Sequence, residues 1–116
     1  MNKEVAKELK KNCTVMDATL KKFNLQVLSF SFRPYSDDND DCTLIIEFST
    51  IDGDSIDDDV NIKVNLYDSD GEIYDTEECS IYSEDFAGFD SRELFFSNNS
   101  RTLKEAKSAR IFATRE

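Results

Sequence analysis

The sequence has 116 residues, which is enough for one domain of ordinary size. Hydrophobic residues make up 39% of it, with nine Phe and four Tyr, so the chain can bury a core and is not a disordered acidic tail. Its 25 acidic and 14 basic residues give a net charge of −11, which disfavours direct binding to nucleic acid or to an anionic membrane.

The opening segment, residues 1–22, is predicted to form an amphipathic helix over residues 3–22 that packs on a domain formed by residues 23–116. Apolar residues recur along the helix at steps of three or four: Val5, Leu9, Cys13, Met16 and Leu20. Thr14 to Asp17 also fits a capping box, which would split the segment into two shorter helices. We expect the apolar face to pack on this domain, or on a second copy in a homodimer, in preference to a membrane surface.

Beyond this helix the apolar residues alternate with polar ones, which is typical of strands. The first strand follows Phe23, changes phase near Val27 in a way that indicates a β-bulge, and stops at Pro34. Further strands are predicted over residues 42–49, 60–66, 73–82, 94–96 and 109–113. A loop is expected over residues 83–91 and a single helical turn over residues 102–106. The pattern predicts a mainly β fold, an immunoglobulin-like antiparallel β-sandwich with an N-terminal α-helix.

The strand over residues 60–66 is expected to form a hairpin with the strand that follows it. Ser69, Asp70 and Gly71 supply a three-residue turn in which Gly takes the left-handed conformation. The returning strand is predicted to place its side chains on two faces: Ile73, Cys79 and Ile81 on one, and Tyr74, Thr76 and Tyr82 on the other.

Residues 60–76, VNIKVNLYDSDGEIYDT, resemble the FxLYD domain, a bacterial immunoglobulin-like β-sandwich named for its F-x-L-Y-D signature. Four residues match the family in place, namely Leu66, Tyr67, Asp68 and Gly71, whereas Val64 stands where the family has Phe. The later stretches RELFF and KSARIFA are similar to the last strands of such domains. The resemblance implies an extracellular or cell-surface sandwich without catalytic residues.

The chain contains no His, which removes His-based triads, proton shuttles and most catalytic zinc sites. Its three Cys cannot all pair with one another, so Cys13, Cys42 and Cys79 are predicted to be reduced structural thiols. Acidic residues directly precede Cys42 and Cys79 and are expected to raise the pKa of both thiols. We therefore expect no enzymatic activity.

The acidic residues are concentrated in the middle of the chain. Residues 1–33 carry seven Lys or Arg and three Asp or Glu, whereas residues 34–100 carry two and twenty. Six carboxylates on two loops are candidate calcium ligands: Asp37, Asp38, Asp40, Asp41, Asp68 and Asp70. The same acidic surface would suit a nucleic-acid mimic that inhibits a basic partner. Solvated loops that protect strand edges are the alternative interpretation of these charges.

A non-enzymatic interaction or accessory module with an unknown protein partner is the leading prediction. Its candidate surface consists of three tyrosines that are expected to be exposed: Tyr67, Tyr74 and Tyr82. The sequence shows no membrane-spanning run and no apolar core of a signal peptide. We expect a cytoplasmic protein if Met1 is the native start, and an extracellular or cell-surface one if a signal peptide has been removed.

Overall fold

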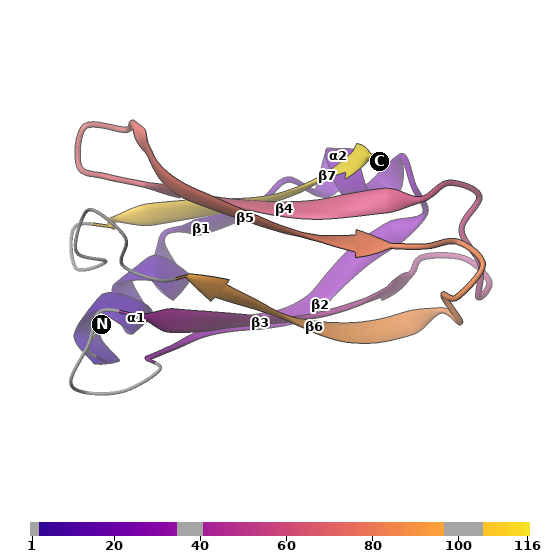
Figure 1. Ribbon diagram of the computed structural model, residues 1–116, viewed down its shortest axis with the longest axis horizontal. Helices are drawn as coiled ribbons and strands as arrows, with labels where there is room; N and C mark the ends of the chain where they lie inside the picture. The colour runs from indigo at the N-terminus through magenta and orange to yellow at the C-terminus, as the bar shows by residue number, and fades with distance from the viewer. Residues whose placement is uncertain (1–2, 35–40, 97–105) are drawn as a thin grey trace.

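The protein is a sandwich of two β-sheets with two short helices along one side (Figure 1). The computed structural model describes residues 3–34, 41–96 and 106–116. Within them, a four-stranded sheet has the strand order β1-β7-β4-β5 and a three-stranded sheet the order β2-β3-β6. In chain order the elements are α1 Lys3–Lys11, β1 Cys13–Val15, α2 Asp17–Lys21, β2 Leu25–Pro34, β3 Cys42–Thr50, β4 Val60–Tyr67, β5 Ile73–Ile81, β6 Phe89–Phe96 and β7 Ser108–Arg115. The predicted mainly β sandwich with an N-terminal helix is confirmed.

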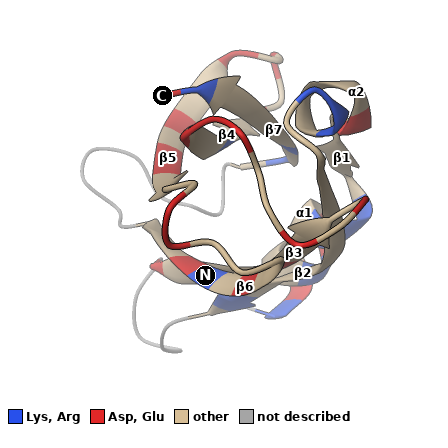
Figure 2. Cartoon of the chain, turned by 90° about the vertical axis from the view of Figure 1, so that its right-hand side faces the viewer, with Lys and Arg blue, Asp and Glu red and all other residues tan. Residues whose placement is uncertain are grey.

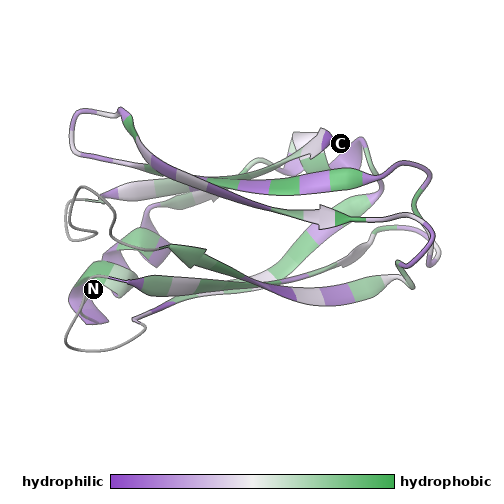
Figure 3. Cartoon of the chain, viewed as in Figure 1, coloured by the Kyte–Doolittle hydropathy of each residue, from purple (hydrophilic) through white to green (hydrophobic). Residues whose placement is uncertain are grey.

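The core lies between the sheets and is centred on their interior strands, above all β3 and β4. Every second residue of these strands is buried: Cys42, Leu44, Ile46, Phe48 and Thr50 in β3, and Val60, Ile62, Val64 and Leu66 in β4. Figure 3 shows the alternation as green and purple bands along β4. Since both strands have neighbours on both sides, one face of each meets the opposite sheet and the other faces solvent. The alternation that the sequence predicts for them is confirmed.

The bulge predicted in the first strand is present in β2. The register between β2 and β3 shifts between Val27 and Ser29, which leaves Leu28 as the extra residue. Its side chain is 54% exposed although it lies in an apolar stretch. The strand begins at Leu25, because Asn24 takes a left-handed conformation with a φ of 62° that interrupts the extended backbone.

The opening segment is not the single helix over residues 3–22 that the spacing predicts. Residues 13–15 form β1, which pairs in parallel with residues 109–111 of β7. The β-branched side chains of Thr14 and Val15 favour this extended conformation. The pairing covers an edge of β7 that would otherwise be open.

Two helices flank this short strand, as the alternative of a divided segment predicts. The division falls at the predicted capping box, Thr14 to Asp17, but the N-cap of α2 is Met16, which makes no side-chain cap hydrogen bond. Leu9 of α1 and Leu20 of α2 are fully buried. Both helices are therefore anchored on the sandwich by aliphatic side chains, as expected.

The predicted hairpin between β4 and β5 is present and is held by its turn residues. Gly71 has a φ of 79°, the left-handed conformation that the turn requires. The Oδ1 atom of Asp68 accepts hydrogen bonds from the backbone N–H groups of Asp70 at 2.9 Å and Glu72 at 3.1 Å. This carboxylate therefore organises the turn from within.

A second bulge changes which side chains of β5 face inward. The register of β4 and β5 shifts between Leu66 and Tyr67, so Tyr74 is an extra residue with no partner opposite. The sequence assigns Ile73 to the inner face and Tyr74 to the outer, and both assignments are wrong: Ile73 is 59% exposed and Tyr74 packs against the core. Beyond the bulge the prediction holds, because Ile81 is buried.

The strand β6 begins earlier than the sequence predicts, so part of the predicted loop over residues 83–91 is extended. Asp90 and Arg92 lie opposite Phe48 and Ile46 of β3 and therefore point inward. A half-buried strand is usually recognised by apolar residues at every second position. Asp90 and Arg92 occupy such inward positions, so the sequence does not show that pattern here.

The last strand, β7, is also longer than its predicted range of residues 109–113. The predicted helical turn lies outside the described residues except for Ala106, which is buried. Among the helices that the structure describes, none has the length and the apolar character needed to cross a membrane.

Candidate functional site

The sandwich has two open sides, because each sheet ends in an edge strand on both sides. On one side β5 faces β6, and on the other α1 and α2 contact both β2 and β7 (Figure 1). The two sides are closed by different means, and cavities lie between α1 and β2 on the helical side.

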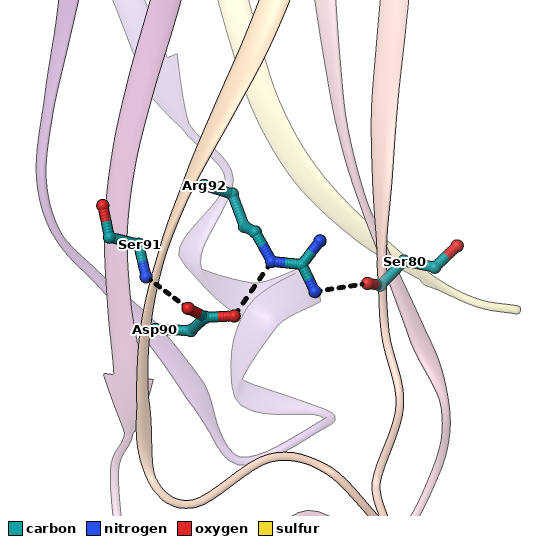
Figure 4. Close-up of polar contacts among 4 residues, drawn as sticks. All are labelled: Ser80, Asp90, Ser91 and Arg92. Carbon is teal, nitrogen blue, oxygen red and sulfur yellow. Dashed lines mark hydrogen bonds and ion pairs between the residues drawn. The ribbon is translucent and has the colours of Figure 1, made fainter.

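A polar clasp formed by Ser80, Asp90 and Arg92 closes the side between β5 and β6 (Figure 4). The guanidinium of Arg92 donates to the backbone carbonyl of Ser80 at 3.0 Å and, through Nε, to Oδ2 of Asp90 at 2.9 Å. Oδ1 of Asp90 accepts the backbone N–H of Ser91 at 2.8 Å. The hydrogen bond with Asp90 raises the pKa of Arg92, which keeps the guanidinium charged. Because it joins β6 to β5, the clasp connects the two sheets directly.

Carboxylates on the inner side of β5 add to this closure. Asp75 and Glu77 lie opposite the buried Leu66 and Val64 of β4, so they point toward the space between the sheets. Burial, followed by the charges of Asp75 and Glu78, raises the pKa of Glu77. Charges that point inward on an edge strand oppose pairing with a foreign strand. This side of the molecule is therefore protected against strand addition.

The opposite side holds an open trough between α1 and β2, which we call the basic trough. Two cavities of about 460 and 190 Å³ form it, and Lys10 lines both. The larger cavity is bounded mainly by Val15, Asp17, Val27, Leu28 and Phe30. The smaller one is bounded by Lys3, Ala6, Lys7, Phe32 and Pro34.

Aromatic rings form the floor of the basic trough. Phe30 and Phe32 meet edge to face, with ring centres 6.4 Å apart and planes at 83°. The Nζ atom of Lys10 lies 6.0 Å from the centre of the Phe30 ring, at the outer range of a cation–π contact. A cation thus stands over an apolar floor where the two cavities meet, and the exposed Leu28 lies at the rim of the larger one.

The basic trough carries a local charge opposite to that of the whole protein. Residues 3–34 contain seven Lys or Arg and three Asp or Glu, whereas residues 41–96 contain two and seventeen. In the end-on view of Figure 2, the blue residues of α2 and the red residues of β5 lie on opposite sides of the sandwich. The excess of Lys and Arg in residues 3–34 therefore belongs to the helices and β2, whereas the excess of Asp and Glu in residues 41–96 belongs to β3 to β6 and their loops.

Within the described residues, the carboxylates predicted to bind calcium are not gathered into one site. Asp68 is buried and committed to the β4–β5 turn, and Asp70 is exposed in the same turn. Asp41 precedes β3 in the other sheet. No cluster of three or more His, Cys, Asp or Glu suited to a metal ion occurs in the described part of the chain. Three of the candidates lie outside it, namely Asp37, Asp38 and Asp40, so calcium binding stays a prediction.

The three tyrosines proposed as an interaction surface lie in different environments. Tyr67 is half-buried, with the guanidinium of Arg110 4.9 Å from its ring centre, and its hydroxyl accepts a hydrogen bond from Asn65 at 3.2 Å. The hydroxyl oxygen of Tyr74 is buried, so the expected exposure of this residue is wrong. Tyr82, just after β5, is 44% exposed. Tyr67 and Tyr74 lie near the turn of the β4–β5 hairpin, whereas Tyr82 follows the other end of β5, so the three do not form one exposed surface.

The thiols are protonated at neutral pH. Burial raises the pKa of Cys13 and of Cys42 to about 12. It also raises the pKa of Cys79, against the opposing charge of Arg92. Burial, rather than the acidic neighbours that the sequence shows, is thus the main cause of the raised values.

Sequence reasoning did not find the basic trough. It placed the lysines of α1 in a predicted helix and Phe30 in a predicted strand, without connecting them. One signal was available, since the change of phase near Val27 implies a residue that turns out of the sheet. Nothing local indicates that α1 lies beside that bulge, because the contact joins segments of different secondary structure.

No known protein family matches the sequence, and no curated protein matches it either. Among solved structures, the fold is similar to the crystal structure of cj0090 from Campylobacter jejuni, with a TM-score of 0.49 and 15% sequence identity. The similarity covers 90% of this chain and 98% of the other. A resemblance at this level assigns no function.

Proposed function

We propose that this protein is a non-enzymatic protein-interaction module that binds its partner through the basic trough. The observation that carries the proposal is the coincidence of an apolar, aromatic floor with lysines on a protein whose net charge is −11. Exposed apolar surface rimmed by polar groups is typical of interaction sites. The cation over Phe30 adds an element of charge selection to an otherwise apolar contact.

The non-enzymatic part of the proposal is supported by the chemistry of the candidate groups. The sequence has no His, and all three thiols are protonated at neutral pH for the reason given above. A protonated thiol is a weak nucleophile. The trough is bounded mainly by Lys and apolar side chains, with Asp17 and Ser29 among them. The hydroxyl of Ser29 donates to Oε1 of Glu47 at 2.6 Å in an exposed position, and the sequence has no His to act as the base that such a hydroxyl usually requires.

The finer description of the fold as immunoglobulin-like, and the kinship with FxLYD domains, are part of this proposal. They are supported by Leu66, Tyr67 and Asp68, which end β4 and begin the turn, and by the left-handed Gly71. The proposed role as an accessory module agrees with the non-catalytic character that this resemblance implies.

A photo-crosslinking experiment tests the proposed site. A benzophenone amino acid at Leu28, on the rim of the trough, is expected to form a discrete adduct with a partner in cells of the natural source. The same probe at Thr76, an exposed residue on the far sheet, serves as the matched control. Equal adducts at both positions, or none at Leu28, would contradict the proposed site.

A further inference from the structure

Resting on the proposed function, we infer that the basic trough binds an extended, acidic segment of a partner protein, with carboxylates and apolar side chains at alternate positions. The apolar side chains enter the floor formed by Val27, Phe30 and Phe32, and the carboxylates meet the lysines of α1. Shape, spacing and charge each support this partner chemistry.

The shape of the trough favours an extended chain. It runs beside β2, an edge strand that is paired only with β3 among the described residues. Backbone groups along such an edge are matched by the backbone of another extended segment. A helical partner satisfies its own backbone groups and leaves those of β2 to water. Residues 27–30 of this edge strand line the larger cavity, together with Lys10 of α1.

The spacing of the lysines matches a strand with acidic residues at every second position. Lys3, Lys7 and Lys10 line the trough from one face of α1, over roughly 10 Å at the rise of an α-helix. Alternate residues of an extended chain lie about 6.7 Å apart on one side. Two or three such carboxylates therefore match the row of ammonium groups, and the side chains between them point toward the floor.

The charges set the position of the acidic segment. Of the described residues that line the two cavities, three are lysines and one, Asp17, is acidic. Asp17 lies in the larger cavity, so the carboxylates of the partner belong toward the other end, between Lys3 and Lys10. The cations that line the two cavities are all lysines, which pair with carboxylates as point charges and do not require bidentate geometry.

A membrane surface and a second copy are less suitable occupants. The apolar face of α1 is already used, because Ala6 and Leu9 are buried against the sandwich, and nine residues form a short helix. The acidic strand of a second copy would be β5, but its Asp75 and Glu77 point inward and oppose strand pairing.

Fluorescence anisotropy tests the inference on the full chain. The probe is a fluorescein-labelled peptide in which Glu and Leu alternate, with Lys–Leu and Glu–Ser peptides of the same length as controls. We expect the Glu–Leu peptide to bind and the two controls to bind at least about tenfold more weakly. The double substitution Lys7→Glu with Lys10→Glu is expected to weaken binding about tenfold, since two ion pairs become repulsions. Leu28→Asp should have a similar effect.

A matched control separates the trough from net charge. Lys63→Glu with Lys107→Glu changes the net charge equally, away from the trough, and is expected to leave the affinity within about twofold. Thermal melts confirm that each variant is folded. Equal binding of all three peptides, insensitivity to the trough variants, or binding to phosphatidylglycerol vesicles in place of the peptide would overturn the inference. Crosslinking at Leu28 without any peptide binding would overturn it while leaving the proposed function intact.

Discussion

The core of the sandwich is covered by polar contacts at one of its open sides and by apolar contacts at the other. Between β5 and β6, a charged residue from one sheet bonds to the backbone of the other, and inward carboxylates discourage further pairing. Beside β2, aliphatic anchors of two short helices cover the core but leave the bulge and its neighbours accessible. The closure between β5 and β6 is polar and mainly acidic, whereas the closure beside β2 is apolar and has lysines at its cavities. The comparison teaches that the proposed binding surface lies where helices cover the core and leave cavities beside β2.

Removal of the main anchor of the helical side should have the largest effect. Leu9→Ala is expected to lower the free energy of unfolding by about 3 kcal/mol, because Leu9 is fully buried and its loss leaves a cavity under α1. Urea denaturation measures the change. Lys11→Ala, an exposed position on the same helix, should change stability by about 0.5 kcal/mol or less. Equal effects of the two substitutions would show that α1 is not held by its apolar face.

Loss of the polar clasp should have a smaller effect. Arg92→Met is expected to destabilise by about 1 kcal/mol, because the bonds to Ser80 and Asp90 are lost but their surroundings remain partly hydrated. Urea denaturation measures this too. Arg115→Met removes a more exposed ion pair with Asp58 and should be nearly neutral. The affinity of the Glu–Leu peptide for Arg92→Met should equal that for the unaltered protein.

Neutralising an inward carboxylate should give the smallest effect, with opposite sign. The pKa of Glu77 is raised in the folded protein, so its ionised form opposes folding. The folded protein therefore favours the protonated carboxyl. The favourable contribution of the protonated form is fully present below the unfolded pKa of about 4.3 and is lost as the pH rises through the folded pKa. Glu77→Gln is therefore expected to stabilise at pH 7 by about 0.5 kcal/mol or less after solvent screening.

Thermal melts at pH 7 and pH 4 measure this difference. The gain from Glu77→Gln should shrink as the pH falls, because the native carboxyl becomes neutral as well. Glu93→Gln is the matched control, since Glu93 is an exposed residue of β6 and its charge does not contribute to the raised pKa of Glu77. A gain for Glu77→Gln that is unchanged at pH 4 would contradict the electrostatic explanation.

The strands that could be predicted from the sequence are those in which inward and outward residues alternate because one face of the strand is buried. The strands that begin at Cys42 and Val60 were found because every second residue in each of them is buried, without interruption. The bulge near Val27 was also found, since it shifts the same alternation by one. What failed were the places where a distant partner decides the local structure. Residues 13–15 keep a helical spacing yet pair with β7, and Tyr74 turns inward because of a register shift across the hairpin.

The candidate site was less predictable than the fold. The tyrosines were selected for their residue type, but a bulge turns Tyr74 toward the core, and Tyr67 is half-buried beside Arg110. The basic trough depends on α1 lying against β2, a contact that no periodicity in either segment encodes. Its lysines were visible in the sequence, and their aromatic floor became visible only in three dimensions.

The parallel pairing of β1 with β7 also has a consequence for the rate of folding. Residues 13–15 pair with residues 109–111, so this contact joins segments that are far apart in the sequence. Contacts of large sequence separation raise the contact order, and a high contact order is associated with slow folding. Because α1 and α2 flank β1 in the sequence, we expect the helical flank to be completed late in folding.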